Sequence, residues 1–380
     1  MTGPLDWVTD ALDHLEAEGL RRRLRHRGER TGAIVDGRRS FASNDYLDLA
    51  GDPRVAEAAA EAAHRWGAGS GASRLITGGT VLHRELEQHI AAWKGTQDAV
   101  VFSSGYLANA GTIPALVGRS DAVFSDELNH ASIVDGCRLS GAAVRVYPHN
   151  DVAALEQALA EVPAHRRLVV TDGVFSMDGD AADVGALAAV ARRHGAMLMV
   201  DDAHGAGVIG PDGRGTAAAQ GAEADVDVAV GTLSKAFGAA GGYVAGRHDL
   251  CEWLRNRARG FVFDTAPPPP AVGAALAGLR ISLAEPWRRH QATAAARDLA
   301  DRLGVAPPAA CVVPLLVGSA DRAVALAAQL AGSGIDVTAI RPPSVPPDTS
   351  RLRFTTTAAH TADDVDRVAG AVAAALGAIA

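Results

Sequence analysis

Six short apolar runs rich in valine recur along this chain and constrain its fold more than any other feature. They occupy residues 99–104, 121–126, 142–148, 168–176, 196–205 and 226–235. Most are separated by segments with helical periodicity, such as DVAALEQALAEV and DVGALAAVARRHG. Short, continuously apolar strands that alternate with helices are typical of a mainly parallel sheet covered on both faces. The pattern therefore predicts an α/β fold.

The flanking segments complete the expected organisation. Residues 241–246, GGYVAG, follow the last run closely and suit an antiparallel neighbour. The prolines of APPPP at 266–270 interrupt the alternation. A long helical stretch from about Ala271 to Leu303, further strands, one of them over 335–340, and a final helix from about Thr361 are expected after them. We therefore expect three parts: a helix and hairpin segment (1–40), a large domain (41–265) and a smaller α+β domain (266–380).

Composition excludes several classes of protein. The net charge of −8 argues against nucleic acid or an anionic membrane as the main partner. No apolar run approaches the ~18 residues of a membrane span, and the acidic, amphipathic N-terminus is not a signal peptide. The three cysteines Cys137, Cys251 and Cys311 have neither disulfide-framework nor metal-ligand spacing. We expect a cytoplasmic protein without a metal.

Polar side chains collect where the predicted strands end. Parallel sheets bind ligands beyond the carboxyl ends of their strands. Five strand ends supply residue types suited to catalysis, namely His130, Ser176, Asp201, His204, Thr232 and Lys235. The helix that begins after SSG at 103–105 offers free backbone N–H groups to a phosphate. A ligand site is expected at this edge.

Lys235 is the sharpest candidate among these residues. The chain has 36 basic residues, of which only Lys94 and Lys235 are lysines. Arginine can replace lysine in an ion pair but cannot form a Schiff base. A lysine desolvated at the end of a buried strand has a lowered pKa and can attack a carbonyl. With Asp201 to keep a pyridine nitrogen protonated, Lys235 suits pyridoxal 5′-phosphate (PLP), whereas Lys94 has no such setting and is expected at the surface.

The glycine-rich stretch GSGASRLITGG at 69–79 does not fit a nucleotide-binding loop. It lacks the Gly-Lys-Ser/Thr ending and a preceding strand. The glycines are better explained by a tight backbone path near a ligand.

Long ordered motifs along nearly the whole chain resemble the α-oxoamine synthase family of fold-type I PLP enzymes. They include FASNDYLDLA, GSGASRLITGGTVLHRELE, SSGYLAN, TDGVFSMDGD, VDDAHGAGVIG, GTLSKAFG and RLRFTTTAAHT. The resemblance implies a large domain with a mainly parallel seven-stranded sheet and a homodimer with shared active sites. It also implies condensation of an amino acid with an acyl-CoA thioester, with release of CO₂ and CoA.

The family's roles can be carried over to this sequence one residue at a time. The resemblance implies that Lys235 holds the cofactor and then acts as the base. Asp201 would pair with the pyridine nitrogen, His130 would stack on the ring, and His204 would bond its hydroxyl with Ser176 nearby. Other implied cofactor contacts, to the phosphate, are Gly105, Tyr106, Thr232 and, from the partner subunit, Thr265. Implied substrate contacts are Arg21, Asn44, His130, Arg341, Ser344 and Arg353, the last for the carboxylate.

The substrate pair is expected from the C-terminal segment VTAIRPPSVPPDTSRLRFTTTAAHT. It most resembles the family member that joins L-alanine to pimeloyl-CoA in biotin biosynthesis. Pimeloyl-CoA and a pimeloyl carrier-protein thioester are not distinguished. Two alternatives remain open: a glycine-using relative (2-amino-3-ketobutyrate CoA ligase or 5-aminolevulinate synthase), since alanine and glycine differ by one methyl group, and a non-catalytic subunit of the same fold.

Overall fold

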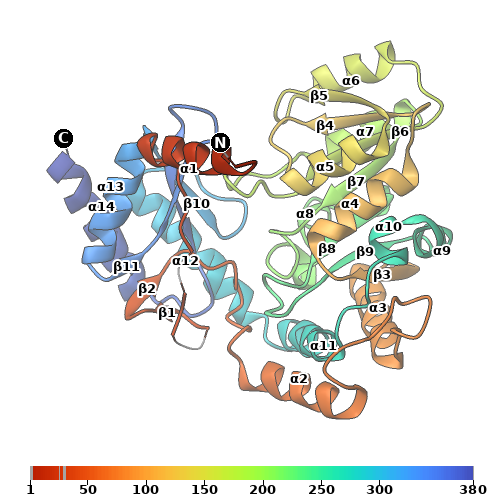
Figure 1. Ribbon diagram of the computed structural model, residues 1–380, viewed down its shortest axis with the longest axis horizontal. Coiled ribbons are helices and arrows are strands. Elements are labelled where there is room, and N and C mark those ends of the chain that lie inside the picture. Colours follow the sequence, from red (N-terminus) through yellow and green to blue (C-terminus); the bar gives the residue numbers. More distant parts are fainter. Residues whose placement is uncertain (1–2, 25, 29–30, 380) are drawn as a thin grey trace.

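A seven-stranded sheet forms the centre of the larger part of the molecule (Figure 1). The structure is a computed structural model that describes residues 3–24, 26–28 and 31–379. The sheet has the order β3-β9-β8-β7-β6-β4-β5. Its strands are β3 (Asp98–Phe102), β4 (Ala122–Asp126), β5 (Ala143–Tyr147), β6 (Arg167–Asp172), β7 (Met197–Asp201), β8 (Val228–Thr232) and β9 (Gly242–Gly246).

The direction of the strands confirms the expected α/β fold. Strands β4 to β8 pair in parallel, and β9 pairs antiparallel with both β8 and β3. Strands β3, β4 and β9 are buried along their whole length, and β6 and β7 are buried apart from their first residue, which explains why they read as continuous apolar runs.

Helices cover both faces of the sheet. On one face Val123, Val170 and Met199 pack under α4 (Gly105–Leu116), α5 (Ala131–Ser140), α9 (His248–Arg257) and α10 (Arg259–Val262). The other face splits into two clusters. One lies under α2 (Pro53–Trp66), α3 (Val81–Lys94) and α11 (Pro269–Ala284), and the other under α6 (Val152–Glu161), α7 (Val184–Arg193) and α8 (Thr216–Ala219). Two short 3₁₀ turns complete this part (Pro211–Gly213 and Glu223–Asp225).

The rest of the chain gathers on one side of the sheet (Figure 1). An antiparallel sheet has the order β10-β13-β12, and a second small sheet has the order β1-β2-β11. The elements are α1 (Asp6–Ala17), β1 (Ile34–Val35), β2 (Arg38–Ser40), α12 (Trp287–Leu303), β10 (Val312–Gly318), α13 (Ala320–Gly332), β11 (Ile335–Asp336), β12 (Thr338–Ile340), β13 (Ser350–Thr355) and α14 (Ala362–Ile379). The expected hairpin is β1–β2.

Two expectations from the sequence are wrong in detail. The long helix expected over 271–303 is two helices, α11 and α12, because Glu285 precedes Pro286 and leaves the helical conformation. The single strand expected over 335–340 is divided, since β11 pairs with β2 and β12 pairs with β13.

Lys94 also contradicts its expected place at the surface. It is 8% exposed at the end of α3, and its ammonium donates a hydrogen bond to the carbonyl oxygen of Arg214. Burial lowers the pKa of Lys94, while the nearby carboxylate of Asp202 opposes that shift. Lys94 therefore ties α3 to the segment that follows β7.

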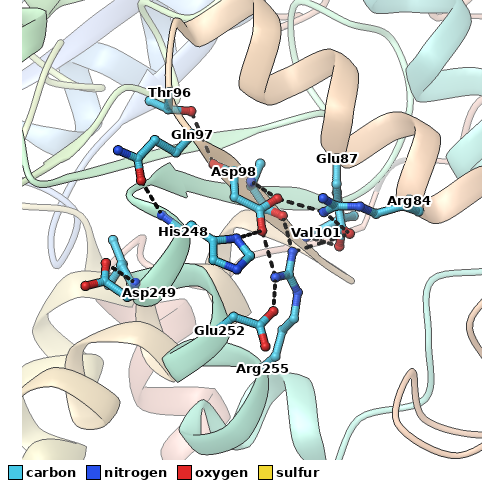
Figure 2. A network of polar contacts seen from close by, with 12 residues as sticks. Arg84, Glu87, Thr96, Gln97, Asp98, Val101, His248, Asp249, Glu252 and Arg255 are labelled. Atoms are coloured by element: carbon cyan, nitrogen blue, oxygen red, sulfur yellow. Dashed lines mark hydrogen bonds and ion pairs between the residues drawn. The ribbon is translucent and has the colours of Figure 1, made fainter.

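A buried ionic network ties β3 to the helices beside it (Figure 2). Asp98, 1% exposed, accepts hydrogen bonds from Arg84 (2.7 Å) and Arg255 (2.8 Å). Glu87, fully buried, accepts from Arg74 (3.0 Å) and from the backbone N–H of Val101 (3.2 Å). The network thereby joins α3, β3 and α9 with the glycine-rich segment at 69–79.

The division at residues 40 and 265 stays a prediction. Helix α11, which follows the proline run, packs mainly on α2 and α3 of the larger part. That packing favours a boundary after α11 rather than before it.

Candidate active site

The residues that follow the strands of the large sheet meet around one cavity of about 260 Å³. It lies at the carboxyl edge of the parallel strands, where β6 ends at Asp172 and β7 at Asp201 in neighbouring register. Its lining residues are Ser104, Gly105, Tyr106, His130, Ser132, Asp172, Ser176, Asp201, Ala203, His204, Thr232, Ser234 and Lys235. All six strand-end residues singled out in the sequence therefore lie in one place.

Lys235 lies just beyond β8, and its amine contacts His204. The Nζ atom is 2.9 Å from Nε2 of His204. Burial lowers the pKa of Lys235 to about 8, against the opposing charges of Asp201 and Asp172. Burial also lowers the pKa of His204 well below its ordinary value, with Lys235 adding to the effect. A neutral imidazole therefore stands beside an amine that is partly deprotonated near neutral pH.

Asp201 is held by donors on both oxygens. Its Oδ2 accepts a hydrogen bond from Nδ2 of Asn109 (2.6 Å), and its Oδ1 accepts from the backbone N–H of Ala203 (3.1 Å). The Asn109 amide also donates to Ser132 (2.9 Å), whose hydroxyl lies 2.8 Å from Nδ1 of His130. A side-chain network from α4 therefore fixes the carboxylate and the imidazole together.

Asp172 is a buried carboxylate that sequence reasoning missed. Its Oδ2 accepts the backbone N–H of His130 (2.8 Å), so it holds the turn that starts α5. Burial raises the pKa of Asp172 well above its ordinary value, and the neighbouring charge of Asp201 adds to this. Asp172 is the last residue of β6, a strand that the sequence predicts. Its position at the carboxyl end of a parallel strand is the signal from which it could have been found.

The first turn of α4 and the end of β8 form a cradle of small residues. Ser104 caps the helix by accepting the N–H of Leu107 (3.1 Å). A Cβ on Gly105 would lie 3.2 Å from Cβ of Thr232, which is tighter than most such contacts, so glycine favours the close approach of these two segments. The Thr232 hydroxyl lies 2.7 Å from the hydroxyl of Ser234. Ser234 is a second lining residue that sequence reasoning missed. The Tyr106 hydroxyl donates a hydrogen bond to the carboxylate of Asp135.

Strand β13 brings Arg353 to the same region from the C-terminal part. Its Nε donates to the carbonyl oxygen of Ser176 (2.5 Å), and both terminal nitrogens donate to Oδ1 of Asn44 (3.2 Å each). Arg353 is 6% exposed. The two residues lie beside the cavity rather than in its lining, with their polar atoms turned toward each other.

The remaining predicted residues lie outside this cavity. Ser344 lines a second cavity of about 980 Å³, which shares His130 and Ser176 with the first and is bounded by the prolines of 342–347. Arg341 donates to the carbonyl oxygen of Arg21 (3.2 Å), whose own side chain lies 3.5 Å from Glu16. The neighbour of Arg21, Arg22, donates to the hydroxyl of Ser344 (3.0 Å).

Thr265 is exposed, and within a single chain it does not reach the smaller cavity. Its carbonyl oxygen accepts a hydrogen bond from Ser103 (3.2 Å). A contact from Thr265 to a cofactor therefore stays a prediction that concerns a partner subunit.

The donor set fits PLP. A buried amine of lowered pKa suits a Schiff base, and a fixed carboxylate suits a protonated pyridine nitrogen. The free N–H groups at the start of the 12-residue helix α4, beside the Thr232 and Ser234 hydroxyls, suit a phosphate. Among the described residues, no cluster of histidine, cysteine or carboxylate side chains could hold a metal ion.

Comparisons with known proteins agree with this chemistry. The model of the family "Aminotransferase class I and II" matches residues 39–372. A curated 8-amino-7-oxononanoate synthase of Anaeromyxobacter dehalogenans is 55% identical, with 98% of this chain and 96% of the relative covered.

Solved structures are similar over almost the same length. A serine palmitoyltransferase from S. paucimobilis with a bound PLP–myriocin aldimine has a TM-score of 0.92 and 33% identity, covering 99% of this chain and 98% of that one. An 8-amino-7-oxononanoate synthase from Francisella tularensis has a TM-score of 0.78 and 26% identity, covering 90% of this chain and 99% of that one.

Proposed function

This chain belongs to the aminotransferase class I and II family, and from that premise we propose that it joins L-alanine to a pimeloyl thioester. The products are 8-amino-7-oxononanoate, CO₂ and the free thiol, and the pathway is biotin biosynthesis. The observation that carries the proposal is full-length similarity to synthases of that name. An amino acid and an acyl thioester are the substrates of this kind of enzyme, and PLP is the cofactor.

The two cavities, which share two lining residues, support a two-substrate reaction. The smaller one holds the lysine and the carboxylates, and a compact amino acid fits beside them. The larger one has apolar walls from Leu128, Val134 and Val345 and suits an acyl chain. Since His130 and Ser176 line both cavities, the two reacting carbons can meet at these residues.

The chain's own residues have distinct tasks in this mechanism. When bound, PLP supplies an electron-withdrawing ring that stabilises negative charge at the amino acid's α-carbon. The Asp201 carboxylate, held by Asn109, favours a protonated ring nitrogen. Arg353 binds the amino acid's carboxylate with its guanidinium fork. Lys235, whose pKa is about 8, takes up the α-proton in its neutral form.

Three finer points belong to the same proposal. The active form is a homodimer in which Thr265 of one subunit serves the site of the other. Helices of the described residues lack the combination of length and apolarity that a membrane span requires. The cytoplasm is proposed as the compartment, and the three unpaired, buried thiols support it.

The deciding experiment measures thiol release with paired substrates. L-alanine, glycine and L-serine are each combined with pimeloyl-, acetyl-, succinyl- and palmitoyl-CoA. The expected result is the highest kcat/KM for L-alanine with pimeloyl-CoA, and a preference for a glycine pair would replace the proposal with a glycine-using enzyme. Pimeloyl-carrier protein is tested as the alternative thioester.

Substitution of Lys235 tests the site itself. We expect Lys235→Ala to lose turnover and the visible absorbance of the bound cofactor, because alanine has no amine to form the Schiff base. Absorbance spectra before and after addition of L-alanine measure this directly. Wild-type turnover in the variant would refute the role of Lys235, and an absence of turnover in both proteins would indicate a non-catalytic subunit.

A further inference from the structure

A continuous series of polar contacts leads from Arg353 to Lys235 through the buried hydroxyl of Tyr46. Arg353 donates to Oδ1 of Asn44, which lies 3.2 Å from the hydroxyl of Tyr46. That hydroxyl lies 2.5 Å from Nδ1 of His204, whose Nε2 is 2.9 Å from the amine of Lys235. We propose that Tyr46 is a positioning residue that fixes the tautomer of His204, so that a lone pair on Nε2 faces Lys235.

Burial shields the contact between Tyr46 and His204 from water. Tyr46 is 0% exposed and His204 is 6% exposed, so water does not compete for their polar atoms. Burial raises the pKa of Tyr46, which keeps the hydroxyl protonated, and burial lowers the pKa of His204, which keeps the imidazole neutral. A neutral imidazole carries one N–H and one lone pair, and its neighbours decide which nitrogen has which.

The direction of each hydrogen bond in this series follows from Arg353, where the series begins. A guanidinium only donates, so Oδ1 of Asn44 accepts from it. The same oxygen is an acceptor for the proton of Tyr46, and the Tyr46 oxygen then accepts Nδ1–H of His204. The assigned tautomer therefore has its proton on Nδ1, and the lone pair of Nε2 accepts a hydrogen bond from the Lys235 amine.

This arrangement links the two ends of the proposed reaction centre. Arg353 is the proposed anchor of the amino acid's carboxylate, and Lys235 is the proposed base, so the inference rests on the proposed function. Tyr46 can donate and accept at once, whereas a phenylalanine there can do neither.

The test begins with the wild-type chain. Nitrogen-15 NMR of histidine-labelled full-length protein, with and without PLP, distinguishes the two neutral tautomers, and the signal missing from His204→Gln identifies His204. We expect the proton on Nδ1. A proton on Nε2 of His204 in the wild-type protein overturns the proposal without any variant at position 46.

Tyr46→Phe removes only the hydroxyl. We expect the His204 signals to shift toward the other tautomer and kcat to fall about tenfold or more, while KM for L-alanine changes much less. Tyr243→Phe is the matched control, because Tyr243 is also fully buried and its hydroxyl has no hydrogen-bond partner among the described residues. That control is expected to leave the His204 signals and kcat unchanged.

The outcomes separate this inference from the proposed function. Unchanged His204 signals in Tyr46→Phe refute the role of Tyr46 even if the enzyme makes the expected product. Absence of turnover with every substrate pair refutes the proposed function, and the tautomer measurement still decides the role of Tyr46. Should Tyr46→Phe not fold by circular dichroism, the wild-type tautomer remains the decisive measurement.

Discussion

The only two lysines of the chain differ in their surroundings, and we propose a catalytic role for Lys235 and a structural role for Lys94. Lys94 is buried and Lys235 is half-buried, and both have a lowered pKa. The amine of Lys235 faces a neutral imidazole at the edge of a cavity, whereas that of Lys94 donates to a backbone carbonyl near Asp202. Both residues are equally unusual in the sequence. Only their local contacts distinguish Lys235, the proposed catalytic lysine, from Lys94, which stabilises the fold.

Substitution of Lys94 is expected to affect stability and not turnover. Lys94→Met leaves the carbonyl of Arg214 without its donor and Asp202 without its nearest positive charge. The free energy of unfolding should fall by about 1–3 kcal/mol, as measured in urea with activity assayed in parallel. Arg145→Ala, an exposed basic residue on β5, is the control and should change neither quantity. Unaltered stability in Lys94→Met would contradict the structural role.

At the scale of elements, the first strand of the large sheet depends on ionic contacts as well as on apolar packing. Burial alone would raise the pKa of Asp98, but hydrogen bonds from Arg255 and Arg84 outweigh it and hold the pKa well below its ordinary value. A carboxyl group of this kind stabilises the fold above its ordinary pKa of 3.8. The contribution is lost as the pH falls through the lower pKa of the folded state.

Asp98→Asn should therefore destabilise the protein strongly at neutral pH. Removing one partner of a buried ion pair costs about 3–5 kcal/mol, and here Arg84 and Arg255 each lose one of their counter-charges. Chemical unfolding at pH 7 and at progressively lower pH measures the difference between variant and wild type, which should shrink in acid. Asp249→Asn, in an exposed pair with Arg247, is expected to behave like the wild type. A difference that grows in acid would contradict this account.

The elements of the large sheet could be predicted because each strand is a continuous apolar run. The gathering of Lys235, Asp201, His204 and His130 could be predicted too, since parallel strands bring their carboxyl ends to one edge. The contact between Arg353 and Asn44 could not, because 308 intervening positions separate them in sequence and the chain must fold before they meet. Tyr46 lies inside the motif FASNDYLDLA and Asn109 inside SSGYLAN. Their hydrogen bonds could not be predicted, because they depend on tertiary packing.

At the scale of the whole molecule, one apolar cluster joins the two main parts. It combines Tyr46 and Leu49 with Val174 and Ala236 near the large sheet, and with Cys311 before β10. Cys137 and Cys251 lie instead in the cluster on one face of the large sheet. The three thiols therefore report on two different regions of the core.

Thiol modification should reveal the order in which these regions open. Burial raises the pKa of Cys137 to about 11, and that of Cys251 and Cys311 to about 12, so none reacts while the fold is closed. We expect Cys311 to react first, because its cluster is lost when the two parts separate while the sheet core persists. Mass spectrometry of peptides after timed alkylation measures the rates. Equal rates, or earlier reaction of Cys137, would indicate that the molecule opens as a single unit.

The fixed position of Arg353 has a consequence for selectivity. A free arginine side chain gives up about 1.5–2 kcal/mol of rotational freedom when it is ordered. Arg353 has already been ordered during folding by Ser176 and Asn44, so an arriving carboxylate meets a rigid fork instead of a mobile chain. Such a fork does not reshape itself around a ligand of different geometry. The carboxylate recognition that we propose for Arg353 is therefore decided when the protein folds, before any substrate is present.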